Sequence, residues 1–283
     1  MKILMIGAHP DDCELSCAGL ALKYIRDGHQ VRFLSMCDGS GGHHELNRNE
    51  IAARRWEETR KVAAFLGVEY DVWNIPDCEL MADLETRGRL VRYIREYAPD
   101  VVFGHRTNDY HADHRNAGIL LQDASYLLIV PNYCPEVKAL PKMPIIIHYE
   151  DEFMNPPFVP DAVIDVEDEM ETKFRAFDLN VSQAYEWLPY TYGKIDEVPE
   201  DEEERYLWMK GDIIDENTDD ADILAKKFWG RNPRFATTAA RFRKQLVERY
   251  GERGNRIVFA EAYAVCEYGS PLTEEMKKKI FPY

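Results

Sequence analysis

Short apolar runs alternate with longer amphipathic stretches through much of the chain. The opening run, residues 2–6, is aliphatic and leaves no room for a helix before Pro10, so it predicts a strand buried on both faces. Later apolar runs predict strands at residues 30–37, 70–75, 101–103, 142–149 and 162–166. Between them, apolar residues at helical spacing predict helices at residues 15–26, 49–65, 84–97, 115–128 and 168–179.

This alternation of strands and helices is typical of an α/β fold. Strand–helix–strand units place neighbouring strands parallel and cover both faces of the sheet with helices, so we expect a Rossmann-like three-layer fold with a mostly parallel sheet and a C-terminal extension. A chain of 283 residues favours one domain of about 200 to 250 residues with an appendage. We therefore expect a core over residues 1–190, with an acidic insertion and a C-terminal extension over residues 191–283 packing on it.

The segment after the predicted core changes in composition. Residues 196–222 hold thirteen acidic side chains against Arg205 and Lys210, a pattern typical of a solvated face. Residues 228–243 then mix aromatic side chains with arginines. We expect these arginines to neutralise the acidic run, either within the chain or across a subunit contact, so a homo-oligomer is one hypothesis.

Charge and cysteine content narrow the function classes. The net charge of −16 argues against electrostatic binding to nucleic acid or to an anionic membrane, and favours a small molecule as the partner. Neither a long apolar span nor a signal sequence is recognisable in the chain. The six cysteines lack the spacing of a disulfide framework. We expect a cytoplasmic protein with reduced thiols.

A polar motif follows the first predicted strand. Residues 7–14 place His9, Asp11 and Asp12 at the carboxyl end of that strand, where ligands bind in open α/β sheets. A helix start accounts for the proline and one aspartate, but it leaves the histidine and the second aspartate unexplained. The turn lacks the G-x-G-x-x-G pattern, and its carboxylates would repel a phosphate. Dinucleotide binding is therefore disfavoured.

A second polar motif, residues 105–114, follows the fourth strand. Catalytic zinc takes three protein ligands and leaves a position for water. His9 and Asp12 are three residues apart on one side of a helical turn, and either His111 or His114 could complete the set. Imidazole plus carboxylate favours Zn²⁺ or another first-row divalent ion over Ca²⁺ or Mg²⁺. Tyr110 is a candidate contact to the substrate.

These motifs resemble the PIG-L/LmbE-like family of metal-dependent N-deacetylases. The resemblance rests on residues 8–12 with Glu14, on residues 108–114, and on the Asp38–Gly39 loop, and covers roughly residues 1–185. Members remove acetyl groups from N-acetylglucosamine-containing compounds, and some cleave other amides. The chain departs from the family pattern at three positions, Ala18, Ala112 and Asn180.

The resemblance implies a role for each matching residue. The metal ligands would be His9, Asp12 and His114, and the general base would be Asp11. Protonated His111 would stabilise the oxyanion, with Asp113 orienting it. The remaining candidates, expected to contact the substrate, are Arg55, from an Arg-x-x-Glu pattern, and Asp77, from a Pro-Asp turn.

Amide hydrolysis on an amino sugar is the function that this set predicts. Asp11 would take a proton from metal-activated water and pass it to the leaving amine. Two alternatives stay open: a metal-dependent amidase for another acyl group, and a non-catalytic carbohydrate-binding protein. The other histidines are assigned no role, although His105 and His148 end strands on the same side of the sheet, while His43 and His44 are interpreted as a surface pair.

Overall fold

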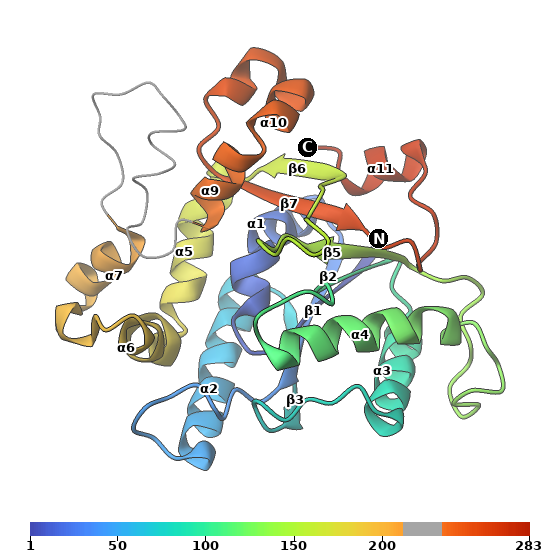
Figure 1. Ribbon diagram of the computed structural model, residues 1–283, viewed down its shortest axis with the longest axis horizontal. Helices are drawn as coiled ribbons and strands as arrows, with labels where there is room; N and C mark the ends of the chain where they lie inside the picture. Colours follow the sequence, from blue (N-terminus) through green and yellow to red (C-terminus); the bar gives the residue numbers. More distant parts are fainter. Residues whose placement is uncertain (212–233) are drawn as a thin grey trace.

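The computed structural model describes residues 1–211 and 234–283 (Figure 1). Within these residues seven strands form one sheet in the order β3-β2-β1-β4-β5-β7-β6. The strands are β1 (Lys2–Gly7), β2 (Gln30–Cys37), β3 (Glu69–Ile75), β4 (Val101–Gly104), β5 (Ile145–Tyr149), β6 (Ala162–Asp165) and β7 (Ala260–Val265). β1 to β5 pair in parallel, and β7 pairs antiparallel with both β5 and β6. The predicted α/β fold with a mostly parallel sheet is confirmed.

Helices cover both faces of the sheet, as the pattern predicted. One face packs against α1 (Asp12–Arg26), α2 (Arg48–Leu66) and α5 (Met170–Asp178), and the other against α3 (Leu84–Tyr97) and α4 (Ala112–Leu127) (Figure 1). A π-helical turn, Ser182–Trp187, follows α5. The remaining described α-helices are α6 (Leu188–Thr191), α7 (Glu202–Lys210), α9 (Arg234–Arg241), α10 (Arg243–Tyr250) and α11 (Glu274–Ile280).

The sequence pattern missed strand β7. Its sequence, Ala-Glu-Ala-Tyr-Ala-Val, places Glu261 at a buried position, and glutamate is depleted in strands. The Glu261 carboxylate accepts a hydrogen bond from Lys173 Nζ at 2.6 Å and from the backbone amides of Gly19 and Leu20 at 2.9 and 2.8 Å. Partners from two distant segments therefore compensate the buried charge of Glu261. The local sequence pattern does not indicate that this residue is buried.

The segment after residue 190 contributes β7 to the sheet. It also supplies part of a third apolar cluster, in which Phe242 and Leu246 pack against Phe158 and Val163. The division of the chain at residue 190 stays a prediction. The acidic run at 196–222 lies outside the described residues beyond Gly211, and so do residues 228–233 of the aromatic and arginine-rich segment at 228–243. No helix in the described parts of the chain is long and apolar enough to cross a membrane.

The strand order creates a crevice at the centre of the sheet. β1 and β4 are neighbours, but β2 and β3 extend the sheet to one side of them while β5 extends it to the other. The loops after β1 and β4 therefore separate, and ligands bind in open α/β sheets at such a switch point. Both polar motifs of the sequence meet there.

Gly118 allows α4 to lie close to the loop that follows β4. A Cβ at this position would be 2.5 Å from the backbone oxygen of Arg106. We predict that Gly118→Ala lowers the free energy of unfolding by about 1–3 kcal/mol, a typical cost of overpacking, as measured by denaturant unfolding. In the control Gly88→Ala, a Cβ would meet the end of the flexible Arg92 side chain at 3.1 Å, so no loss is expected. Equal stability of Gly118→Ala and the wild type would contradict this packing argument.

Candidate metal centre and active site

The turn after β1 fixes the position of Asp12. α1 begins at Asp12, and the Asp12 Oδ2 atom accepts hydrogen bonds from the backbone amides of Ala8 and His9, both at 2.8 Å. Gly7 makes this turn possible, because a Cβ there would lie 2.6 Å from Asp12 Cβ. The carboxylate is therefore held by backbone donors, with its Oδ1 atom directed to His114.

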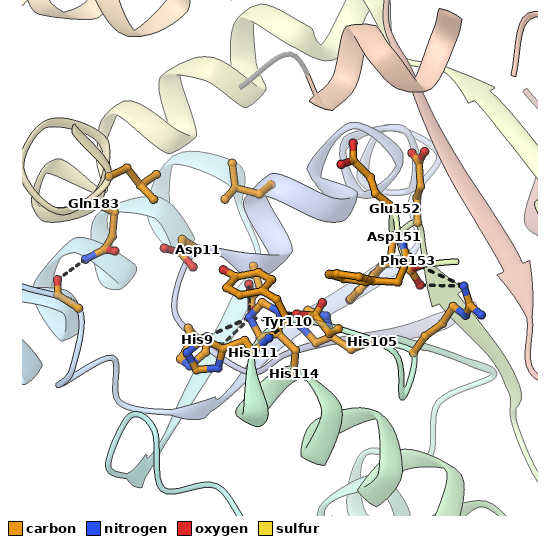
Figure 2. A pocket seen from close by; sticks show the side chains of 18 of the residues that line it. His9, Asp11, His105, Tyr110, His111, His114, Asp151, Glu152, Phe153 and Gln183 are labelled. Carbon is orange, nitrogen blue, oxygen red and sulfur yellow. Dashed lines mark hydrogen bonds and ion pairs between the residues drawn. The ribbon is translucent and has the colours of Figure 1, made fainter. Parts of the chain in front are cut away.

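Three predicted metal ligands, His9, Asp12 and His114, line the crevice, and Figure 2 shows the two histidines near each other. His9 Nδ1 lies 3.2 Å from His114 Nε2, His114 Nε2 lies 3.4 Å from Asp12 Oδ1, and His9 Nδ1 lies 3.7 Å from Asp12 Oδ2. Tetrahedral zinc with bonds of about 2.0–2.1 Å separates its ligand atoms by roughly 3.3 Å. The His9–His114 and His114–Asp12 distances match this separation, while His9 approaches the other oxygen of Asp12, so these three residues stay the predicted ligand set.

His105 belongs to the same cluster, although the sequence analysis assigned it no role. It is the first residue after β4; its Nε2 atom lies 3.2 Å from Asp12 Oδ2, and its ring stacks on His114 with 4.3 Å between centroids. Burial and the neighbouring His114 lower the pKa of His105. Its position at the end of a central strand was the available signal. His148, at the end of β5, is buried and does not line the cleft.

Two carboxylates hold the far side of His9. His9 Nε2 lies 3.1 Å from Asp113 Oδ2 and 3.0 Å from Asp77 Oδ1. Burial lowers the pKa of His9, but the hydrogen bonds with Asp113 and Asp77 raise it to about 10. Ligand histidines typically donate their second ring nitrogen to a carboxylate in this way. Because a ligand histidine must lose a proton, metal binding here should release protons.

Asp113 and Asp77 each direct a carboxylate oxygen to His9. Asp113 was predicted to orient His111, but its carboxylate contacts His9 and accepts from the backbone amides of Cys78 and Leu80 at 2.7 and 3.2 Å. The backbone amide of Asp113 donates to the His111 Nδ1 atom at 3.2 Å, and the orienting role of the Asp113 carboxylate stays a prediction. Asp77 lines the cleft, yet its Oδ1 atom is directed to His9. Substrate contact by Asp77 stays a prediction.

Asp113→Asn tests the support of His9. The Asp113 carboxylate uses both oxygens as acceptors, whereas an asparagine side chain has one oxygen and one NH₂ group. In the variant, the NH₂ group would therefore face one of the present hydrogen-bond donors. We predict that metal affinity falls by about 10- to 100-fold, the typical cost of losing a partner of a ligand histidine. Competition with a chromophoric chelator measures the affinity. Asp123→Asn on the same helix, whose carboxylate is 44% exposed, is the control. Unchanged affinity in Asp113→Asn would contradict the proposed support.

Asp11, the predicted general base, has an unusual backbone conformation. Its φ of 129° lies in a region that residues other than glycine rarely adopt, at a typical cost of about 1–3 kcal/mol. Arg55 Nη2 donates to Asp11 Oδ2 at 2.8 Å and to the carbonyl of Pro10, and the Asp11 amide donates to the Tyr70 hydroxyl at 3.3 Å. Burial raises the pKa of Asp11 to about 6, against the opposing charge of Arg55. The side chain lines the cleft beside the predicted metal ligands (Figure 2).

Arg55 was predicted to contact substrate, and the structure places it in a different set of contacts. It is only 2% exposed and is bonded to Pro10 and Asp11. Glu58, one helical turn later, accepts from the backbone amide and the hydroxyl of Ser182 at 2.9 and 2.6 Å. Arg55 and Glu58 thus connect the turn that carries Asp11 with the π-helical turn. Substrate contact by Arg55 stays a prediction.

His111 and Tyr110 lie at the opening of the site. The His111 ring meets His9 edge-on with 4.6 Å between centroids. Burial and the neighbouring His9 and His114 lower the pKa of His111, which disfavours its protonated form. The protonated His111 stays a prediction. Tyr110 is 76% exposed, and its ring centroid is 5.8 Å from those of both His111 and His114. Tyr110 is therefore placed to meet a ligand above the metal centre.

The predicted surface pair of histidines is wrong for His43. Only 4% of its side chain is exposed, and its Nε2 atom lies 2.7 Å from Glu186 Oε2. His44 stacks on Tyr190 with 4.2 Å between centroids. Both rings therefore connect the loop after β2 to the region around the π-helical turn, a contact between distant segments that sequence spacing does not reveal.

A cleft of about 490 Å³ opens over the predicted metal centre. Its size lies in the range of small-molecule sites, about 300–1,000 Å³. The loops after β1, β4 and β5 line it together with residues around the π-helical turn, including Gln183, Trp187 and Tyr192. The α/β sheet carries a cluster of histidines and aspartates at its switch point, and this cluster opens to the cleft. Such an arrangement is typical of enzymes that bind a divalent ion next to a small-molecule substrate.

Similarity to known proteins identifies the family. Residues 4–125 match the PIG-L family, described as GlcNAc-PI de-N-acetylase. The diacetylchitobiose deacetylase of Thermococcus kodakarensis is 32% identical over 211 residues, which cover 69% of this chain and 78% of the relative. The chain belongs to the PIG-L family.

Other relatives share the fold with more distant sequences. The solved structure of N,N'-diacetylchitobiose deacetylase from Pyrococcus horikoshii has a TM-score of 0.67 and 24% identity, and covers 94% of this chain and 84% of its own. A 4-oxalmesaconate hydratase from Pseudomonas putida is 24% identical over 196 residues, covering 66% of this chain and 76% of the relative. The proteins to which this chain is similar therefore carry different named activities.

Proposed function

We propose that this protein is a zinc-dependent hydrolase that removes the acetyl group from an N-acetylated amino sugar. The observation that carries the proposal is the placement of Asp11 beside His9, Asp12 and His114, with 3.2 Å between His9 Nδ1 and His114 Nε2 and 3.4 Å between His114 Nε2 and Asp12 Oδ1. The identity with a diacetylchitobiose deacetylase supports the amino-sugar substrate. The mixed imidazole and carboxylate set supports Zn²⁺ or another first-row ion.

The side chains divide the work of amide hydrolysis among them. Zinc, when bound, lowers the pKa of water from about 16 to about 7 and polarises a carbonyl oxygen. Asp11 accepts a proton from the attacking water as the carbon–oxygen bond forms, then delivers it to the amine nitrogen as the carbon–nitrogen bond breaks. The products are acetate and the free amine. His111, whose ring lies next to that of His9, would donate to the oxyanion.

Amine release from defined substrates tests the proposed function. The purified protein, reconstituted with zinc, is incubated with N,N'-diacetylchitobiose, and amine and acetate are measured together. Equal amounts of both, lost on chelation, are the expected result. Release only from analogues with longer acyl groups would identify the alternative amidase, because an acetyl-sized pocket rejects them. Sugar binding by the zinc-loaded protein without any amine release would identify a carbohydrate-binding protein.

A further inference from the structure

The cleft carries a large excess of negative charge. Among the described residues that line it are two arginines, Arg55 and Arg106, and seven carboxylates, Asp11, Asp12, Asp77, Asp109, Glu150, Asp151 and Glu152. One bound divalent cation would still leave the carboxylates in excess by three. Charge of one sign along a cleft with walls of low dielectric focuses the electric field and selects among charged ligands.

Neither arginine is available to an anionic ligand. Arg55 is committed to Asp11 and to the carbonyl of Pro10. Arg106 Nη1 contacts the two carboxylate oxygens of Asp151 at 2.9 and 3.2 Å, and its Nη2 atom donates to the carbonyl of Pro156 at 2.8 Å. A phosphate or carboxylate group would have to break one of these sets of contacts to find a cation.

The outer wall of the cleft presents one unpaired carboxylate. Residues 150–153 follow β5, which pairs in parallel with β4, so they lie beside the loop that carries Tyr110. Glu150 is paired with Arg241 and Asp151 with Arg106. Glu152 is exposed, and within the described residues the structure gives it neither a hydrogen bond nor an ion pair. Figure 2 shows it above Phe153 on the same side of the cleft.

Aromatic rings beside Glu152 offer a surface for a sugar. The Tyr110 and Phe153 ring centroids are 6.5 Å apart, and Trp187 and Tyr192 also line the cleft. Such rings bury apolar faces of a ligand without supplying a positive charge. The part of a substrate that extends from the metal centre therefore meets aromatic rings and a carboxylate.

We propose that this cleft accepts N-acetylated amino sugars whose remaining groups are uncharged or cationic, and rejects those that carry a phosphate or carboxylate. Glu152 acts as a specificity-determining residue at the outer wall. The inference rests on the proposed deacetylase function and narrows its substrate class. The inferred substrates differ from the one in the description of the matching family, GlcNAc-PI de-N-acetylase. We expect this chain to disfavour phosphorylated substrates.

Three α-glycosides of N-acetylglucosamine that differ in charge test the inference: the methyl glycoside, the 2-aminoethyl glycoside and the 1-phosphate. The zinc-loaded protein should show a kcat/KM about tenfold or more lower for the 1-phosphate than for the methyl glycoside at low salt. The gap should shrink at high salt, because added ions screen exposed charges. The 2-aminoethyl glycoside should match or exceed the methyl glycoside.

Charge reversal at one position assigns the effect to Glu152. In Glu152→Lys the kcat/KM ratio of 1-phosphate to methyl glycoside should rise by about tenfold, and in Glu152→Gln by less. Glu57→Lys, an equal charge change at an exposed position of α2 outside the cleft, should leave the ratio unchanged. Equal turnover of phosphate and methyl glycosides by the wild type, or equal shifts in Glu152→Lys and Glu57→Lys, would overturn the inference.

Binding separates the failure of this inference from that of the proposed function. Calorimetry on the zinc-loaded protein measures the Kd of the same three glycosides without requiring turnover. Weaker binding of the 1-phosphate with no amine release from any glycoside would contradict the deacetylase and keep the charge selection. Amine release with tighter binding of the 1-phosphate would keep the deacetylase and overturn the charge selection.

Discussion

Asp11→Asn is expected to lower kcat for amine release by about 10²- to 10⁴-fold while the protein still binds its metal ion. The magnitude is that of removing a general acid–base group. The substitution preserves the size of the side chain and leaves an amide oxygen for Arg55 Nη2, which now donates to Asp11 Oδ2. His9, Asp12 and His114 are untouched, so the metal content should stay at that of the wild type.

The pH profile gives this prediction a second measurement. Asp11 acts as a carboxylate, and its pKa is raised to about 6, so wild-type kcat/KM should fall as the pH drops through this region. The residual activity of Asp11→Asn should lack this limb. Asp168→Asn, at an exposed position outside the cleft, is the control. Near-normal turnover by Asp11→Asn with full metal content would show that another group moves the proton.

His114→Ala is expected to abolish both stoichiometric metal binding and amine release. It removes the donor that lies 3.2 Å from His9 Nδ1 and 3.4 Å from Asp12 Oδ1, leaving two of the three predicted ligands. The loss of affinity should exceed the roughly 10- to 100-fold that an outer partner of a ligand costs. Elemental analysis and equilibrium dialysis against buffered zinc measure the metal content, and amine release measures activity.

A control histidine and a second donor set sharpen this test. His29→Ala removes a histidine that pairs with the N-terminus and lies outside the cleft, so the metal should remain. If His114→Ala retained one ion per chain and full turnover, a different set would hold the metal. Of the three groups of possible metal donors within the described residues, the one without His114 is His9, Asp77, His111 and Asp113, and substitution of His111 would then test it.

The fold could be predicted where the signal was local. Apolar runs and helical periodicity located β1 to β6, and their alternation with helices predicted the parallel sheet. β7 could not be predicted, because its buried Glu261 is stabilised by Lys173, 88 residues away. The partners of a buried charge come from segments that are distant in the sequence, so the local pattern of residues does not reveal them.

The same distinction applies to the site. The spacing of His9 and Asp12 and the position of the second histidine motif predicted that these residues lie close to His114. The structure places all three around the same cleft. The partners of Asp113 and Arg55 were not predictable, because both side chains reach residues from other loops: Asp113 contacts His9, and Arg55 contacts Asp11. A residue type and its position in a motif predicted proximity to the site more reliably than the particular contact.

Zinc titration of the chelated protein tests the central claim most directly. Metal is removed from the wild-type protein, its absence is verified by elemental analysis, and amine release from N,N'-diacetylchitobiose is followed as zinc is added back. We predict that activity is lost with the metal and returns linearly to a plateau at about one ion per chain, as expected for one three-ligand site. Undiminished amine release from protein verified to lack metal would contradict the account, as would a zinc-loaded protein that releases no amine.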